Sequence, residues 1–160
     1  MKKPKPTPLA KPSPGAKLRT WLLLAGFVAA FLAVLEAYSP ALGGPFVFDD
    51  IYLPFYAPGM ADAPLTTWLS GMRPLLMFSF WLNYRISGTD PYGYHLLNLL
   101  MHLAGGVLIF LVVRKALLWA AEKPGPAEWL AGFAAALFLL HPLQTESVAY
   151  VASRSELLSV

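Results

Sequence analysis

The stretch LRTWLLLAGFVAAFLAVLEAY, from Leu18 to Tyr38, decides the fold because it is almost wholly apolar. A bilayer core of about 30 Å requires roughly 20 helical residues, and this stretch supplies them. Trp21 and Tyr38 lie near its two ends, where amphipathic rings favour the lipid headgroup region. The alternative is a cleavable signal peptide with Lys2 to Arg19 as its basic part. Such peptides have an apolar core of only about 7 to 15 residues, and the nearest small-residue site, Ser39 to Ala41, contains a proline. We therefore expect a membrane-spanning helix.

Three further apolar segments follow the first one. The chain is 57% hydrophobic and only 13% charged, whereas an ordinary soluble domain carries about 25% charged residues. The apolar residues are concentrated in residues 94–118, in residues 127–142, and in a segment that begins at Val148. We expect the fold class to be all-α, a multi-pass transmembrane helical bundle with spans at about 18–38, 94–118 and 127–142 and the start of another from 148.

The segments outside these spans are rich in proline. Residues 1–17 combine proline with lysine and hold too little apolar surface to offset the entropy of ordering, so we expect a disordered basic tail. Residues 39–93 contain prolines at positions 40, 45, 54, 58 and 64, which remove backbone donors and interrupt helices. We expect this segment to be an outer loop, with a short interfacial helix over Pro74 to Ile86.

The distribution of charge predicts the orientation of the chain. With a cytoplasmic tail, the inside segments hold nine cations, which are Lys2, Lys3, Lys5, Lys11, Lys17, Arg19, Arg114, Lys115 and Lys123. The only inside acids are Glu122 and Glu128. The outside segments hold three cations (Arg73, Arg85, Arg154) and seven acids (Glu36, Asp49, Asp50, Asp62, Asp90, Glu146, Glu156). Because lysine and arginine are enriched on the cytoplasmic side, we expect a cytoplasmic N-terminus, and the Ala-, Gly- and Pro-rich composition favours a bacterial plasma (inner) membrane.

The composition also excludes two classes of site. There is no cysteine, so neither a disulfide nor a thiolate metal site can form. The formal net charge is +3, but the basic residues flank apolar spans instead of gathering on a soluble face. This arrangement argues against a nucleic-acid partner and for the lipid bilayer as the surroundings of the chain.

Two adjacent carboxylates, Asp49 and Asp50, follow the apolar tripeptide Phe46 to Phe48 in the outer loop. Neighbouring side chains point in different directions on a helix or strand, so the two cannot act as a facing pair. One of them could serve as a general base in apolar surroundings, while the other orients it, caps a helix or binds a cation. A solvated turn or a helix N-cap is the non-catalytic interpretation.

A polar stripe runs along the second expected span. His95, Asn98 and His102 are spaced by three and four residues, which places them on one helix face. Such a stripe must face protein or water instead of lipid, and interhelical hydrogen bonding explains it without a ligand. His95 and His102 lie two turns apart, which is poor spacing for a metal site. The sequence therefore specifies no cofactor, although a divalent metal is compatible with it.

The end of the third expected span carries further polar groups. His141 ends that span, and Glu146 and Arg154 follow it at the depth expected for the acidic pair. Arginine suits phosphate recognition because its planar fork donates two hydrogen bonds to adjacent oxygens, and Arg73 is a second candidate. The outer face thus gathers carboxylates, an imidazole and two arginines beside lipid, which suits transfer from a phosphate-linked lipid donor.

Several of these residues belong to an ordered set of motifs. They are FVFDD at 46–50, RPL at 73–75 with LNY at 82–84, GYHLLNLLMH at 93–102, HPLQTESV at 141–148 and SRSELL at 153–158. In this order they resemble the membrane portion of the TPR-containing transmembrane O-mannosyltransferases and their bacterial relatives. That family belongs to the GT-C superfamily of glycosyltransferases, which also contains the protein O-mannosyltransferases.

The resemblance implies an inverting glycosyltransferase. It implies transfer of a sugar from a polyprenyl-phosphate donor, at the outer membrane face, to a hydroxyl of a protein or glycan acceptor. By the same resemblance Asp49 deprotonates that hydroxyl with support from Asp50, and Arg154 contacts the leaving phosphate. His141 and Glu146 match a later motif of the family.

The chain also departs from the family pattern. Family members have many more spans and usually a C-terminal TPR array, whereas three or four helices cannot enclose a full donor cavity. We therefore expect residues 18–160 to be a partial GT-C-like membrane region that is inactive by itself. Glu156 stands where the family commonly has aspartate, which keeps the charge and moves the carboxylate by one methylene.

Two other functions stay open. In a non-catalytic membrane anchor or assembly module, the outer polar groups would only hold helices together. In a transporter segment, His95 and His102 would form a proton relay. The transporter hypothesis is the weaker one because the polar groups cluster at one face instead of following a path.

Overall fold

The computed structural model describes residues 14–120 and 126–159. Within these ranges the chain is helical and contains no strand. In chain order the elements are α1 (Pro14–Leu42), η1 (Phe48–Tyr52), η2 (Pro54–Tyr56), α2 (Leu65–Leu69), α3 (Pro74–Ser87), α4 (Pro91–Ala120), α5 (Ala127–Leu140), α6 (Gln144–Ala149), η3 (Val151–Ser153) and α7 (Arg154–Leu157). Most of the tail expected over residues 1–17 lies outside the described residues.

Two helices are long and apolar enough to cross a membrane. They are Lys17–Leu42 within α1, with 26 residues, and Pro91–Ala120, which is α4, with 30 residues. Both extend beyond the predicted limits of 18–38 and 94–118. Their apolar side chains are largely exposed, as at Trp21 (70%) and Val112 (66%), which is the pattern of a helix surface that faces lipid. These two helices indicate a membrane protein.

The third apolar helix, α5, is shorter than expected. It ends at Leu140, before the predicted limit of 142, because the residue that precedes Pro142 is driven out of the helical conformation. His141 accordingly has an extended ψ of 131°. At 1.5 Å per residue its 14 residues cover about 21 Å, less than the roughly 30 Å of a bilayer core.

The segment from Val148 does not begin a long helix among the described residues. It breaks at Tyr150, whose ψ of 112° is extended, and continues as η3 and α7. The helix expected over Pro74 to Ile86 is present as α3, with Pro74 in its first turn.

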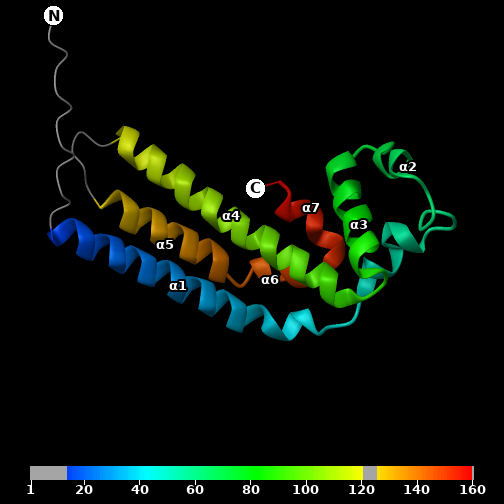
Figure 1. Ribbon diagram of the computed structural model, residues 1–160, viewed down its shortest axis with the longest axis horizontal. Coiled ribbons are helices and arrows are strands. Elements are labelled where there is room, and N and C mark those ends of the chain that lie inside the picture. The colour runs from blue at the N-terminus through cyan, green and yellow to red at the C-terminus, as the bar shows by residue number, and fades with distance from the viewer. Residues whose placement is uncertain (1–13, 121–125, 160) are drawn as a thin grey trace, which may run out of the picture.

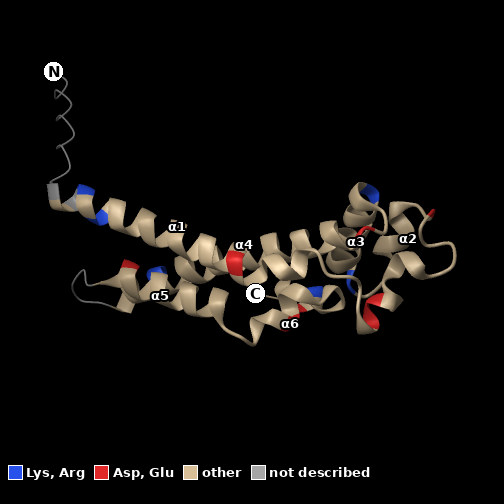
Figure 2. Ribbon diagram, turned by 90° about the horizontal axis from the view of Figure 1, so that it is seen from below, with Lys and Arg blue, Asp and Glu red and all other residues tan. Residues whose placement is uncertain are grey.

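The three apolar helices lie side by side along the length of the molecule, as Figure 1 shows. The start of α1, the end of α4 and the start of α5 meet at one end, which we call the basic end. There Arg19 of α1 and Arg114 of α4 both pair with Glu128 of α5, the second pair at 3.5 Å. The opposite end, formed by residues 43–90 and 141–159, is called the loop end. Figure 2 shows acidic residues gathered there.

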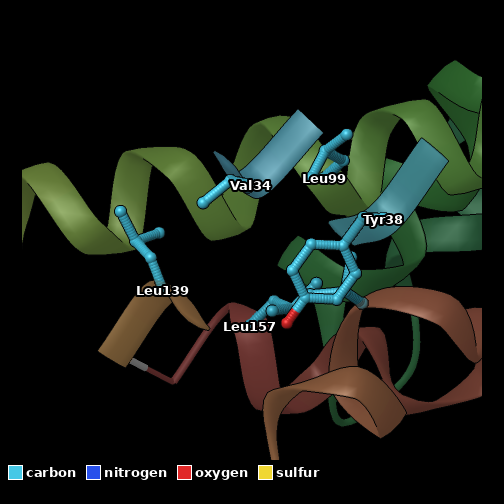
Figure 3. Close-up of a cluster of buried hydrophobic side chains, with 6 residues drawn as sticks. Val34, Tyr38, Leu99, Leu139 and Leu157 are labelled. Carbon is cyan, nitrogen blue, oxygen red and sulfur yellow. The ribbon is translucent and has the colours of Figure 1, made fainter. Parts of the chain in front are cut away.

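Two hydrophobic clusters hold the helices together. The first joins Val34 and Tyr38 of α1 to Leu99 of α4, Leu139 of α5 and Leu157 of α7 (Figure 3). The second is largely aromatic and lies at the loop end, where it contains Leu53, Phe55, Trp68, Phe80, Tyr94 and Val151. The core therefore continues from the helix bundle into the loop end.

Close approach of α4 to α5 depends on Gly106. An added Cβ at Gly106 would lie 2.6 Å from Leu139 Cδ2 and 2.7 Å from its Cγ, well inside van der Waals contact. We expect Gly106→Ala to destabilise the fold by about 1–3 kcal/mol through overpacking, measured as a lower Tm in detergent. Gly132→Ala is the matched control, because a Cβ there meets nothing within 4 Å. Equal Tm values for the two variants would contradict this packing.

Candidate functional site

The two adjacent aspartates of η1 have opposite surroundings. Asp50 is fully buried, and its Oδ1 accepts a hydrogen bond from the Ala152 N–H at 2.7 Å while Oδ2 accepts one from the Val47 N–H at 3.2 Å. Asp49 is exposed, and its backbone N–H donates to the Tyr150 hydroxyl at 2.9 Å. Asp50 therefore ties the loop to the segment after α6, while the Asp49 carboxylate is left facing solvent.

A strained residue precedes the pair. Phe48 has a positive φ of 49°, which is uncommon for a bulky residue and costs on the order of 1–2 kcal/mol. Its ring is 83% exposed and meets Tyr150 edge-on, with ring centroids 6.3 Å apart. Strain of this kind persists only where surrounding contacts hold it, and it concentrates at functional sites.

A groove runs beside the acidic loop. It holds about 570 Å³ and is lined by Val47, Phe48, Thr145, Glu146, Ala149 and Tyr150. The exposed side chain of Glu146 belongs to the same groove. Desolvation raises the pKa of the Tyr150 hydroxyl above its ordinary value, and the neighbouring Asp49 side chain adds to the rise. Tyr150 was not predicted as a site residue, and only its place in the chain after the HPLQTESV motif could have suggested it.

Arg154 is fully buried and forms the centre of a hydrogen-bond network. Its Nε donates to Asn98 Oδ1 at 2.7 Å, and its Nη2 donates to Asn83 Oδ1 at 2.9 Å and to the Tyr94 carbonyl at 3.2 Å. The guanidinium also lies 4.5 Å from the centroid of the Phe80 ring. Burial lowers the pKa of Arg154 to about 10, which still leaves it charged at neutral pH.

These bonds determine what Arg154 can do. They join α7 to α3 and α4, and Ser79 Oγ adds a fourth acceptor for Nη1 at 3.4 Å. A phosphate could reach this guanidinium only if the network opened. The partners Ser79 and Asn83 were missed as site residues, although their spacing of four residues places them on one face of α3.

The stripe on α4 faces protein. His95, Asn98 and His102 are exposed by only 2%, 0% and 1%. Asn98 Nδ2 donates to the Val148 carbonyl at 3.3 Å, and His102 Nε2 lies 3.0 Å from the Leu139 carbonyl. Neither ring nitrogen of His95 has a hydrogen-bonding partner among the described residues. Interhelical hydrogen bonding therefore accounts for Asn98 and His102 but not for His95.

Two of the predicted site residues lie apart from the groove beside Asp49. Arg73 is exposed and lines a second groove of about 390 Å³ together with Ser155 and Glu156. His141 is exposed, and its Nδ1 accepts a hydrogen bond from the Leu143 N–H at 3.2 Å. The described residues contain no group of three or more His, Asp or Glu side chains that could hold a metal ion.

Sequence comparison places the chain among known proteins. No protein-family model and no solved structure matches it. It is 32% identical over 143 residues to protein O-mannosyl-transferase F38B6.6 of Caenorhabditis elegans, covering 76% of this chain and 19% of that protein. It is 41% identical over 87 residues to protein O-mannosyl-transferase Tmtc1 of Drosophila melanogaster, covering 54% of this chain and 9% of that protein. The chain is homologous to the TMTC protein O-mannosyl-transferases.

The homology extends over most of the chain. Mouse protein O-mannosyl-transferase TMTC1 is 29% identical over an alignment of 170 residues, gaps included. The alignment covers 92% of this chain and 17% of the mouse protein. The family resemblance inferred from the motifs is thereby confirmed. The chain spans less than one fifth of the length of these TMTC relatives.

The motifs that carry the TMTC resemblance lie together in space. The acidic pair, the first turn of α3 and the segment from His141 to Leu158 belong to the loop end, and α4 contacts it through α3, α6 and α7. Hydrogen bonds from the Asp49 N–H to the Tyr150 hydroxyl and from the Ala152 N–H to Asp50 join the acidic pair to residues about 100 positions away, which lie between the last two motifs. The fold thus brings segments that are distant in the sequence into contact.

The Arg154 network provides a test of how the loop end is held. We expect Arg154→Met to lower stability by about 1–3 kcal/mol for each buried acceptor left unpaired, chiefly Asn83 and Asn98. Arg85→Met on α3 removes an exposed cation that lies 5.7 Å from the Trp81 ring centroid, and should lower stability by no more than about 0.5–1 kcal/mol. Both effects are read as Tm in detergent. An Arg154 variant as stable as the Arg85 variant would contradict a structural role for this network.

Proposed function

We propose that this chain is part of an integral-membrane glycosyltransferase of GT-C type. The proposed reaction moves a sugar from a polyprenyl-phosphate donor to an acceptor hydroxyl at the non-cytoplasmic face of a bacterial plasma membrane. By the names of the relatives the sugar is mannose and the acceptor is a protein. The helices α1, α4 and α5 would belong to a multi-pass bundle.

The observation that carries the proposal is the division of roles between Asp49 and Asp50. Asp50 is buried and holds the loop, whereas Asp49 is exposed and follows Phe48, which lines a largely apolar groove together with Glu146 and Tyr150. A general base must come within about 2.6–3.2 Å of the proton that it removes, so an exposed and positioned carboxylate is required. Asp49 is exposed and its backbone N–H is held by the Tyr150 hydroxyl, which supports it as the base, whereas buried Asp50 is not open to an acceptor.

The proposed step is a displacement at the anomeric carbon of the donor sugar. The acceptor oxygen bonds to the anomeric carbon while the bond from that carbon to the lipid phosphate oxygen breaks. The hydroxyl proton passes to Asp49, and the negative charge leaves with the lipid phosphate. Attack on the face opposite the leaving phosphate inverts the configuration of the sugar.

The leaving phosphate requires a cationic contact. Arg154 is fully buried among hydrogen-bond acceptors of the protein, whereas Arg73 is exposed in a groove at the loop end. We therefore give Arg154 the task of fixing α3 and α4, and Arg73, whose groove lies apart from the one beside Asp49, is the remaining candidate for the phosphate contact. His141, Glu146, His95, Asn98 and His102 would support the site.

The proposed membrane orientation rests on charge and can be tested by labelling. The sequence contains no cysteine, so each introduced cysteine is unique. In intact cells an impermeant maleimide should label Tyr52→Cys and Thr145→Cys at the loop end. Lys17→Cys and Lys115→Cys at the basic end should react only after the cells are permeabilised. If positions 52 and 145 reported different compartments, the proposed site could not assemble.

The catalytic proposal makes a second prediction, for the full-length gene product. Asp49→Asn should reduce sugar transfer by about 10²–10⁴-fold without lowering Tm, because only the base is lost. Asp50→Asn should lower Tm, because it places an amide where the Ala152 and Val47 N–H groups require an acceptor.

Asp62→Asn is the matched control for both variants, since this exposed carboxylate lies outside the two loop-end grooves. It should change neither transfer nor Tm. Unchanged transfer by Asp49→Asn would remove Asp49 as the base. That outcome would favour the second candidate, a non-catalytic anchor or assembly module, which the structural role of Arg154 also supports.

A further inference from the structure

A long apolar groove runs between α1, α4 and α5, away from the loop end. It holds about 520 Å³, and nearly all of its lining is apolar. Gly26 of α1 and Gly132 of α5 leave it open, because a Cβ at either position meets nothing within 4 Å. Phe27 and Phe110 also line it and meet edge-on with centroids 4.9 Å apart. The groove therefore has space and shape for a hydrocarbon chain.

The groove ends at a cluster of charges. Glu128 lines the groove and pairs with Arg19 and Arg114, whose side chains are still 48% and 41% exposed. Lys17 and Lys115 are exposed at the same end of the bundle. Two arginines thus share one carboxylate and two lysines lie exposed at the same end, so this end keeps an excess of positive charge with arginine N–H groups open to solvent.

Tryptophan residues mark the depth of this cluster. Trp21, Trp119 and Trp129 come from three different helices and are 70%, 78% and 46% exposed. Tryptophan side chains favour the boundary between hydrocarbon and water, because the ring is apolar and its N–H needs a polar partner. The Lys115 ammonium lies 4.7 Å from the Trp119 ring centroid, which places a cation at this boundary. The arginines therefore lie at the depth of lipid headgroups, and the groove lies at the depth of acyl chains.

We propose that this groove binds one phospholipid with an anionic headgroup. An acyl chain lies between α1 and α5, and the headgroup phosphate accepts hydrogen bonds from Arg19 and Arg114. Arginine forms paired hydrogen bonds to phosphate oxygens, and basic pockets between membrane helices bind anionic headgroups. A second copy packed in parallel on the groove would bring two positively charged ends together, which charge repulsion opposes.

Native mass spectrometry of the whole chain tests the headgroup contact. The chain is extracted from vesicles that contain equal amounts of phosphatidylglycerol and phosphatidylcholine. We expect about a five-fold excess of retained phosphatidylglycerol. Arg19→Gln combined with Arg114→Gln should reduce the ratio to about one. Arg85→Gln makes the same type of substitution at the loop end, away from the groove, and should leave the ratio of the two retained lipids unchanged.

Filling the groove tests the acyl-chain contact independently. Gly26→Leu should reduce retention of both lipids about five-fold, because the new side chain occupies the space of the acyl chain. Ala29→Leu is the matched control, since it adds bulk on an exposed part of α1 outside the groove. Gly132→Leu repeats the test from α5, so loss of folding in one variant does not remove the measurement.

Three results would overturn the proposal. One is equal retention of the two lipids by the unmodified chain. Another is unchanged retention in both Gly26→Leu and Gly132→Leu while circular dichroism shows intact helices. The third is a dimer in the unmodified chain that these substitutions convert to monomer, which would identify a second copy as the occupant.

Discussion

The buried guanidinium of Arg154 is the constraint on which the loop end depends. Its hydrogen-bond partners are neutral oxygens of Asn83, Asn98, Ser79 and the Tyr94 carbonyl. Removal of a cation from water costs several kcal/mol, so the burial is tolerable only when these acceptors are all in place. These acceptors belong to α3 and α4. The charged side chain of Arg154 therefore determines how α7 docks against two helices that are distant from it in the sequence.

That docking also positions the acidic loop. The segment just before Arg154 supplies the Ala152 N–H to Asp50 and the Tyr150 hydroxyl to the Asp49 backbone. The buried arginine and the buried aspartate thus hold one short segment from both sides. This support explains how the loop keeps a positive φ at Phe48 next to an exposed carboxylate.

The two ends of the bundle have different chemistry. At the loop end, buried polar groups hold carboxylates beside grooves, whereas at the basic end Glu128 joins Arg19 and Arg114 near the boundary tryptophans. Between them α1 and α4 carry many exposed apolar side chains. This separation suits a membrane, because the apolar middle of the helices can face hydrocarbon while the polar groups lie at the two ends.

The sequence by itself determined the helical class, two long apolar helices, the asymmetry of charge and the relation to O-mannosyl-transferases, because these follow from composition, length and motif order. It did not determine the end of α5, the short helices after Val148, or the surroundings of each charged group. Asp49 and Asp50 are chemically alike and adjacent, and the burial of Asp50 involves the Ala152 N–H about 100 positions away as well as the local Val47 N–H. The same holds for Arg154, whose partners were selected by the packing of α7 against α3 and α4, a contact between distant segments that no local pattern encodes.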